Sequence, residues 1–274
     1  MATIVPEDTR PITINGTSIT VEPGNNAKYW GLVENGRWEP ATFQAINLLV
    51  DDSSTYIDVG AWIGGTVLYS ATKAAKVIAF EPDPEALSIL KTNIAANPAL
   101  ATKIDLIEGG LGIFDGTAAL YNNSPGDSGS SLVSRFGYKN TVEQEKFADI
   151  KLTDGHRFLE GLDMSKVSLI KMDIEGGEYD LIPHIADILK THAPSLHISF
   201  HPFNISPSES ATTNAYLQMS RSGALRDCLS GYQYIYVEKD GQLVANGRQL
   251  ILDQMREKGA VYDAAVFTNR RILS

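Results

Sequence analysis

A glycine-rich turn between two apolar strands constrains the fold of this chain more than any other feature. The first strand, residues 56–59, carries Asp58 near its end and runs into the turn 60–65, and a helix is expected to open at about Thr66. A second apolar strand follows at residues 77–81. This succession is the layout of a nucleoside-cofactor site in a doubly wound sheet. The sequence therefore predicts an α/β fold with a cofactor at the turn.

The acid that ends the second strand indicates what the turn binds. Glu81 lies 21 residues after Gly60. A carboxylate about 20 residues beyond such a turn can accept hydrogen bonds from both hydroxyls of a ribose. Glycine turns also occur in α/β domains for packing alone, and this alternative stays open. The offset of Glu81 favours a nucleoside cofactor.

The residues inside the turn distinguish between cofactors. A dinucleotide-binding loop reads G-x-G-x-x-G, so that a pyrophosphate can rest on the helix N-terminus. Here Trp62 occupies the second glycine position. A bulky indole at that position argues against NAD and fits a cofactor without phosphate, such as S-adenosylmethionine. Asp58 could then meet the ammonium group of this cofactor.

Three runs of sequence resemble the FkbM family of S-adenosylmethionine-dependent methyltransferases. They are residues 57–64, residues 79–84 with Asn93 and Asn97 downstream, and residues 170–178. The third run is the most specific, because it matches the family pattern K-I-D-V-E-G-A-E at Lys171, Asp173, Glu175, Gly176 and Glu178. The resemblance covers about residues 36–202. It implies a Rossmann-like class I methyltransferase fold and O-methylation of a sugar or of a hydroxyl on a secondary metabolite.

The rest of the chain fits that fold. Strands alternate with helices, which predicts a mostly parallel sheet with helices on both faces. Seven strands are expected, the last two as an antiparallel edge pair: residues 55–59, 77–81, 104–108, 167–173, 195–201, 232–238 and 261–268. Helices are expected at residues 83–97 and 177–190. We assign residues 51–274 to the cofactor-binding domain.

Residues 1–50 are expected to form an extension packed on this domain. The alternating stretch 12–21 surrounds Asn15-Gly16, a strong hairpin signal. A helix with Pro40 at its start follows at residues 41–50 and can lie over the cofactor pocket. Trp38 and Glu39 are candidates to close that pocket, although a packing role for Trp38 with a solvated or helix-N-terminal Glu39 is an equally good interpretation.

Candidate site residues cluster at the ends of the predicted strands, because ligands of open α/β sheets bind at the carboxyl ends. His201, with an unperturbed pKa near ~6.5, is the best candidate for a general base, with Asp173 and Glu175 beside it. A histidine bonded to backbone is the alternative. The family often shows an acid before this histidine, so the base is open. Expected cofactor-binding residues are Glu39, Asp58, Gly60, Ala61, Trp62, Gly64, Glu81, Pro82, Gly109 and Asp173.

Two further features have open interpretations. Asp173, Glu175 and His201 are also donors that a divalent metal accepts, but we expect no metal. The polar run 122–131 is either a surface loop or a lid whose Ser130 and Ser131 touch the cofactor or acceptor.

Composition limits the classes of partner. The net charge of −10 gives no electrostatic basis for binding nucleic acid or anionic lipid. A single cysteine, Cys228, excludes an internal disulfide. No apolar run of about 18 residues and no signal peptide are found, so we expect a cytoplasmic enzyme with a small-molecule or glycan acceptor. Homo-oligomerisation stays open. The alternative functions are an NAD-type oxidoreductase and a cofactor-binding module that has lost catalysis.

Overall fold

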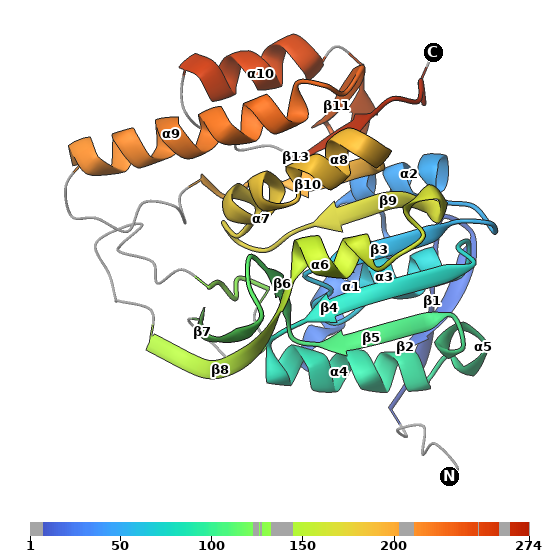
Figure 1. The fold of residues 1–274 in the computed structure, drawn as a ribbon. Helices are drawn as coiled ribbons and strands as arrows, with labels where there is room; N and C mark the ends of the chain where they lie inside the picture. The colour runs from blue at the N-terminus through green and yellow to red at the C-terminus, as the bar shows by residue number, and fades with distance from the viewer. Residues whose placement is uncertain are drawn as a thin grey trace.

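A twisted β-sheet forms the centre of the computed structural model, which describes residues 8–122, 126, 128–132, 145–202, 211–245, 247–257 and 264–273 (Figure 1). The strands are β3 (Thr55–Val59), β4 (Lys76–Glu81), β5 (Ile104–Glu108), β9 (Val167–Met172), β10 (Ser195–Ser199), β11 (Tyr234–Lys239), β12 (Gln242–Val244) and β13 (Ala264–Thr268). Within these residues the eight strands are ordered β12-β11-β13-β10-β9-β3-β4-β5.

The sheet is mostly parallel, as predicted. The five strands from β10 to β5 run parallel to one another. β13 runs antiparallel to both of its neighbours, β10 and β11. The predicted number of seven strands is wrong by one, because residues 242–244 pair back onto β11. A tight turn at Asp240 and Gly241, both with positive φ, allows this pairing.

Helices cover both faces of the sheet. One face carries α1 (Ala27–Glu34), α2 (Pro40–Leu49), α3 (Gly65–Ala71), α4 (Pro84–Ala95) and α5 (Pro98–Ala101). The other carries α6 (Gly155–Glu160), α7 (Glu178–His184), α8 (Ala186–His192), α9 (Ala211–Leu229) and α10 (Gly247–Glu257). Short 3-10 turns occupy Gly24–Asn26 and Met164–Lys166.

Alternation along the strands explains the two layers. In β3, Tyr56 belongs to the hydrophobic cluster of one face and Ile57 to that of the other. The single helix predicted at 177–190 is divided into α7 and α8, because Ile185 leaves the helical conformation two residues after Pro183. None of the helices in the described part of the chain is long and apolar enough to cross a membrane.

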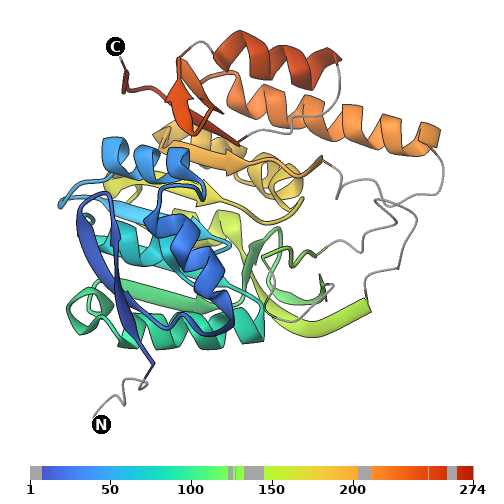
Figure 2. The ribbon, with the colours of Figure 1, turned by 180° about the vertical axis from the view of Figure 1, so that it is seen from behind.

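The N-terminal hairpin forms as expected from its Asn-Gly turn. β1 (Arg10–Ile14) pairs antiparallel with β2 (Thr17–Val21), and Asn15 and Gly16 adopt the positive φ angles that a two-residue hairpin turn requires. Figure 2 shows the hairpin beside α1, on the side hidden in Figure 1. Asn97 holds it to α4: the Asn97 side chain accepts from the backbone N–H of Thr20 at 2.9 Å and donates to its carbonyl at 2.6 Å.

A second, smaller sheet was not predicted. It contains β6 (Gly110–Gly112), β7 (Gly116–Asn122) and β8 (Glu145–Asp154) in the order β6-β8-β7. We expected no strand in this segment, because the polar run after β7 separates two strands that pair with each other. In Figure 1 the small sheet lies beyond the carboxyl ends of β4 and β5, where it can wall a site.

Candidate active site

Two cavities meet at the carboxyl edge of the large sheet. The first, which we call the apolar cavity, has a volume of about 270 Å³ and is lined by Phe80, Glu81, Pro82, Leu111 and Leu152 among others. The second, the charged cavity, has a volume of about 260 Å³ and is lined by Glu39, Lys171, Asp173, Glu175 and His201 with aromatic side chains. Both are lined by Gly60, Trp62, Ser128 and Asp173, so they adjoin at the glycine turn.

The glycine turn brings the ends of two strands together. The backbone N–H groups of Gly60 and Ala61 both donate to the carbonyl of Phe80, at 3.1 and 3.0 Å. Gly60 has a φ of +87°, and a Cβ atom there would collide with the carbonyl oxygen of Asp173. A side chain at position 60 would therefore displace the protein's own backbone, whether or not a cofactor is bound. The predicted Gly64 also has positive φ and caps the N-terminus of α3.

Trp62 separates the two cavities. Its φ is +47°, an uncommon conformation for a large residue, and its indole N–H donates to the carbonyl of Gly126 at 2.9 Å. The ring packs against Tyr29, with centroids 4.5 Å apart, and is stacked near Trp38 at 6.3 Å. The indole therefore fills the position that a second glycine would leave open to phosphates.

Glu81 points its carboxylate into the wall of the apolar cavity. The residue is 4% exposed, and its oxygens accept from the backbone N–H groups of Trp62 at 2.6 Å and Asp83 at 2.8 Å. Burial raises the pKa of Glu81 to about 7. The predicted Pro82 lines the same cavity, and so does Gly110. The predicted Gly109 packs against the backbone of Lys151 instead.

Asp58 lies beneath the cavities rather than in them. It has no exposed surface and accepts from Tyr56 Oη at 3.1 Å, Thr66 Oγ1 at 2.5 Å and Lys171 Nζ at 3.2 Å. Burial lowers the pKa of Lys171, but the charges of Asp58 and Asp173 outweigh this effect and raise it. Asp58 lines neither cavity. The expected contact with the cofactor's ammonium is therefore not supported, and Asp58 instead fixes the position of Lys171.

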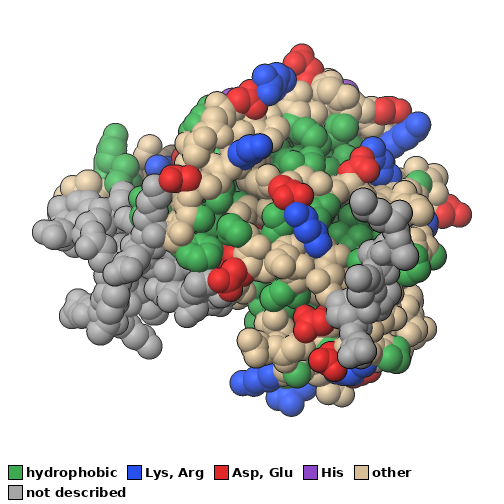
Figure 3. All heavy atoms as spheres, turned by 90° about the horizontal axis from the view of Figure 1, so that it is seen from below, with side chains coloured by type: hydrophobic (Ala, Val, Ile, Leu, Met, Phe, Trp, Pro, Cys, Tyr) green, Lys and Arg blue, Asp and Glu red, His purple; other side chains and the backbone are tan. Residues whose placement is uncertain are grey.

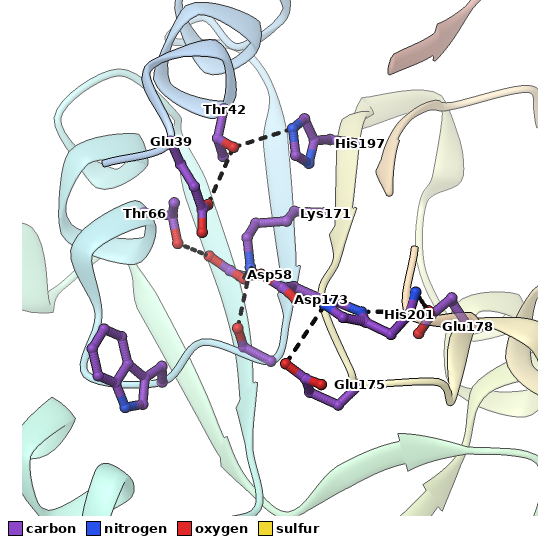
Figure 4. A network of polar contacts seen from close by, with 12 residues as sticks. Glu39, Thr42, Asp58, Thr66, Lys171, Asp173, Glu175, Glu178, His197 and His201 are labelled. Carbon is purple, nitrogen blue, oxygen red and sulfur yellow. Dashed lines mark hydrogen bonds and ion pairs between the residues drawn. The ribbon is translucent and has the colours of Figure 1, made fainter. Parts of the chain in front are cut away.

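Glu39 closes the charged cavity from the N-terminal extension. It precedes Pro40 with a φ of +42° and forms the N-cap of α2. Thr42 Oγ1 lies 3.3 Å from Glu39 Oε2 and 3.2 Å from His197 Nε2 (Figure 4). Burial, together with the charge of Asp173, raises the pKa of Glu39 to about 7, whereas burial lowers that of His197 to about 4. His197 was not among the candidate site residues, because the sequence does not identify the partner of a histidine within an apolar strand.

Asp173, Glu175 and His201 come together as predicted. The residues follow β9 and β10 directly, and His201 Nε2 lies 3.6 Å from Asp173 Oδ1 and 3.5 Å from Glu175 Oε1 (Figure 4). Glu175 adopts a φ of +52°, which turns its side chain into the cavity wall. Strained backbone of this kind is concentrated at functional sites.

Glu178 contacts His201, although we did not include it among the candidate site residues. It is fully buried at the first position of α7, and its Oε1 accepts from the backbone N–H of His201 at 2.6 Å and lies 3.4 Å from His201 Nδ1. Burial lowers the pKa of His201, but Glu178, Glu175 and Asp173 outweigh it and raise that pKa to about 9. The unperturbed value assumed from the sequence is therefore wrong, because the fold surrounds this imidazole with carboxylates.

The polar run after β7 lies over both cavities where it is described. Ser130 donates to Asp83 at 2.8 Å, Ser131 donates to the carbonyl of Glu175 at 2.8 Å, and Ser128 lines both cavities. Ser128 and Ser130 thus line cavities and Ser131 lines neither, so contact of this run with the cofactor or acceptor stays a prediction. Residues 123–125 and 127 of this run lie outside the described residues.

The comparison with known families agrees with this geometry. The family profile described as Methyltransferase FkbM domain matches residues 58–236. The chain belongs to this family. All the predicted site residues except Glu39 lie inside the matched span.

Individual relatives are more distant. The chain is 31% identical over 156 residues to Methyltransferase sdnD of Sordaria araneosa, covering 46% of this chain and 58% of that protein. It is 29% identical over 154 residues to Methyltransferase 1 of Beauveria bassiana, covering 50% of this chain and 60% of that protein. The matches thus span little more than half the length of these curated relatives.

One solved structure shares the fold. The crystal structure of Methyltransferase FkbM from Methylobacillus flagellatus KT superposes with a TM-score of 0.50 at 18% sequence identity, over 84% of this chain and 47% of that chain. The similarity supports the class I methyltransferase architecture.

Proposed function

We propose that the protein is an S-adenosylmethionine-dependent O-methyltransferase whose acceptor is a hydroxyl of a small molecule or glycan. The observation that carries this proposal is the junction of the two cavities at Gly60 and Trp62. One cavity ends at a buried acid suited to a ribose, and the other at a group of carboxylates and an imidazole. A cofactor spanning the junction would present its reactive centre to the second cavity.

The residues of the apolar cavity fit a nucleoside. Each carboxylate oxygen of Glu81 accepts one backbone N–H, and a carboxylate has about four lone-pair sites, so acceptor capacity is left for two ribose hydroxyls. Pro82, Leu111 and Leu152 supply apolar surface for a base. This arrangement supports S-adenosylmethionine, and the bulk of Trp62 in the turn disfavours the pyrophosphate of NAD.

The charged cavity fits the amino-acid end of the same cofactor. Asp173 presents its carboxylate to the junction and Glu39 presents its carboxylate to the charged cavity, where a sulfonium and an ammonium would be attracted. Glu39 replaces Asp58 as our candidate for the ammonium, because its side chain lines the cavity. Tyr29 and Trp38 wall the same side with aromatic rings, whose faces attract cations.

The chemistry requires an acceptor oxygen in line with a departing sulfur. S-adenosylmethionine, when bound, supplies the methyl group: its C–S bond breaks as a C–O bond forms, and sulfur keeps the electron pair. The cavity walls must hold the hydroxyl on that axis, which accounts for much of the rate enhancement in such displacements. Asp173, Glu175 and His201 line the wall toward which the hydroxyl's proton leaves. Because His201 holds its own proton below about pH 9, we assign acceptance of the hydroxyl's proton to the two carboxylates, with His201 positioning them.

The surface supports a small acceptor over a nucleic acid. The net charge is −10, and in the view of Figure 3 Lys and Arg side chains are interspersed with Asp and Glu rather than gathered into a basic patch. A cytoplasmic location and a possible homo-oligomer remain parts of the proposal.

Turnover tests the proposal directly. The protein is incubated with S-adenosylmethionine and a panel of hydroxylated metabolites and glycans, and S-adenosylhomocysteine is quantified. We expect acceptor-dependent release of S-adenosylhomocysteine and a product heavier by one methyl group. Small molecules or glycans of a strain lacking the protein, compared by mass spectrometry, would identify the natural acceptor. Binding of the cofactor without turnover on any of them would favour a module that has lost catalysis.

A further inference from the structure

Three metal-binding side chains converge on one wall of the charged cavity. Asp173, Glu175 and His201 each offer one ligand atom, and these atoms all lie within 4.8 Å of one another. Figure 4 shows the two carboxylates turned toward the same edge of the imidazole. The three residues come from the loops after β9 and β10, so the sheet itself sets their spacing.

The distances suit a shared ion better than direct hydrogen bonds. His201 Nε2 lies 3.6 Å from Asp173 Oδ1 and 3.5 Å from Glu175 Oε1. Hydrogen bonds from a ring nitrogen to a carboxylate are shorter, at about 2.7–3.2 Å. Two donors that each lie about 2.1 Å from one ion, at an angle of about 110–115°, are about 3.5 Å apart.

Glu178 lies outside this group and orients the imidazole. Its side chain has no exposed surface, and Oε1 lies 3.4 Å from Nδ1 of His201 while accepting the backbone N–H of the same residue at 2.6 Å. A carboxylate on one ring nitrogen directs the lone pair of the other ring nitrogen toward a metal, as in carboxylate–histidine–metal arrangements. Here that second nitrogen is the one that faces Asp173 and Glu175.

The charge of the cavity also favours a cation. Glu39, Asp173 and Glu175 line the cavity. The lysine that lines it, Lys171, directs its ammonium to the carboxylate of Asp58 and the carbonyl of Gly60, each at 3.2 Å. It lies farther from Asp173, at 3.8 Å. The acidic wall is therefore balanced only in part by the lysine beneath it.

We propose that Asp173, Glu175 and His201 bind one divalent metal ion. The proposal revises our expectation of no metal, because the sequence places the three donors near one another but does not give the distances between them. Carboxylate donors suit Mn²⁺ and Mg²⁺, whereas imidazole suits Zn²⁺ and related ions, so the mixed set favours Mn²⁺ or Zn²⁺ over Mg²⁺. Three protein donors leave positions open to oxygen atoms of an acceptor, and this catalytic meaning rests on the proposed function.

Metal binding is measured without turnover. The full-length protein is freed of metal with EDTA, dialysed, and titrated with Mn²⁺ and separately with Zn²⁺ by calorimetry, and bound Mn²⁺ is followed by electron paramagnetic resonance. We expect one site per chain, with an affinity at least ~10-fold lower in Asp173→Asn and His201→Ala. Glu175→Gln is the second variant if either of these fails to fold in circular dichroism.

The matched control is another histidine–carboxylate pair. His156 Nε2, on α6, lies 2.8 Å from Asp187 Oδ2, on α8, and neither residue lines the charged cavity. His156→Ala should bind Mn²⁺ as tightly as the original protein. Absence of binding of both ions to the original protein, or equal binding by all the variants, would overturn the proposal.

A separate titration with S-adenosylmethionine keeps this proposal distinct from the proposed function. If the metal-free protein binds S-adenosylmethionine and turns over fully in EDTA without binding either ion, the metal site is wrong and the methyltransferase proposal stands. If one ion binds at the three side chains but S-adenosylmethionine does not bind, the metal site stands and the proposed function fails.

Discussion

Lys171 and Asp58 lie opposite each other in the parallel pair of β9 and β3, and their charged groups are 3.2 Å apart. The side chain of Lys171 is 4% exposed and that of Asp58 is fully buried. The pair lies directly under the charged cavity. Its contact therefore contributes to the stability of the sheet and also fixes the position of the cavity wall. Removing one partner of a buried ion pair leaves the other charge uncompensated.

We therefore expect Lys171→Met to lower the free energy of unfolding by about 3–5 kcal/mol, measured by urea denaturation. Lys76→Met is the matched control, because Lys76 pairs with Asp105 at 2.7 Å across neighbouring strands but both side chains are about half exposed. That change should cost about 1 kcal/mol or less. Equal losses in the two variants would contradict the assignment of Lys171 as a structural anchor of the site.

Much of the large sheet could be predicted because each strand carries its own signal. Thr55–Val59 and Ile104–Glu108 have the predicted bounds, since apolar runs end there at glycine or polar residues. The small sheet could not be found this way. Its strands β7 and β8 are separated by a polar run, and only their pairing in the fold makes Leu120 and Ile150 parts of one hydrophobic cluster.

The site was predictable where a residue's role depends on its place in a motif. Glu81 and the group of Asp173, Glu175 and His201 follow from strand ends, which meet at one edge of a parallel sheet. The roles of Asp58 and His197 depend instead on burial and on cross-strand partners, which a linear pattern does not contain. The glycine at position 60 was identified correctly, but the atom that requires it belongs to Asp173.

The collision at Gly60 leads to a second prediction. Gly60→Ala should reduce both the stability of the protein and its affinity for S-adenosylmethionine, because the new methyl group would displace the Asp173 backbone. Gly36→Ala is the control for backbone strain alone, since Gly36 also has positive φ but has no atom within 4 Å of an added Cβ. We expect about 1–2 kcal/mol from Gly36→Ala and a clearly larger loss from Gly60→Ala in thermal or urea unfolding. Similar losses would show that position 60 tolerates a side chain.

Glu81 provides a third prediction, for cofactor binding. Glu81→Ala should weaken the binding of S-adenosylmethionine by about 1.5–3 kcal/mol in calorimetry, the usual contribution of hydrogen bonds to a charged group. Glu108→Ala is the control, because Glu108 is the register partner of Glu81 on β5 but its side chain is 59% exposed and pairs with Lys91. Its affinity should be unchanged. A folded Glu81→Ala protein with full affinity would remove the ribose assignment.

Because the pKa of Glu81 is raised, we expect the stability of the protein and its affinity for the cofactor to depend on pH in opposite directions. The folded protein holds this proton up to about pH 7, whereas the pKa of an ordinary glutamate in the unfolded chain is 4.5. The contribution of Glu81 to stability is therefore present below about pH 4.5 and is lost as the pH rises through 7. Cofactor affinity should change in the other direction, since the ionised carboxylate accepts stronger hydrogen bonds. Calorimetry between pH 6 and 8 should show tighter binding at higher pH, and Glu81→Gln should reduce this dependence to the part that the ionisation of Glu39 contributes. A pH-independent affinity of the original protein would contradict the assignment.

A further prediction separates catalysis from folding at His201. Glu178 bonds the backbone N–H of His201, a contact that alanine would keep, so His201→Ala should remain folded. We expect kcat to fall by about 10²–10⁴-fold with little change in the affinity for S-adenosylmethionine. The exposed His192 is the control, and His192→Ala should keep full activity. A variant of His201 that loses stability and keeps its kcat would show a packing role.

A crystal structure of the protein with bound S-adenosylhomocysteine tests the central claim most directly. We predict that the ribose hydroxyls lie within hydrogen-bonding distance of Glu81, that the sulfur lies at the junction beside Gly60 and Trp62, and that the amino group faces Glu39. The bound cofactor should leave space for the acceptor in front of Asp173, Glu175 and His201. A ligand bound elsewhere, or one whose ribose does not contact Glu81, would contradict the placement of the cofactor across the two cavities.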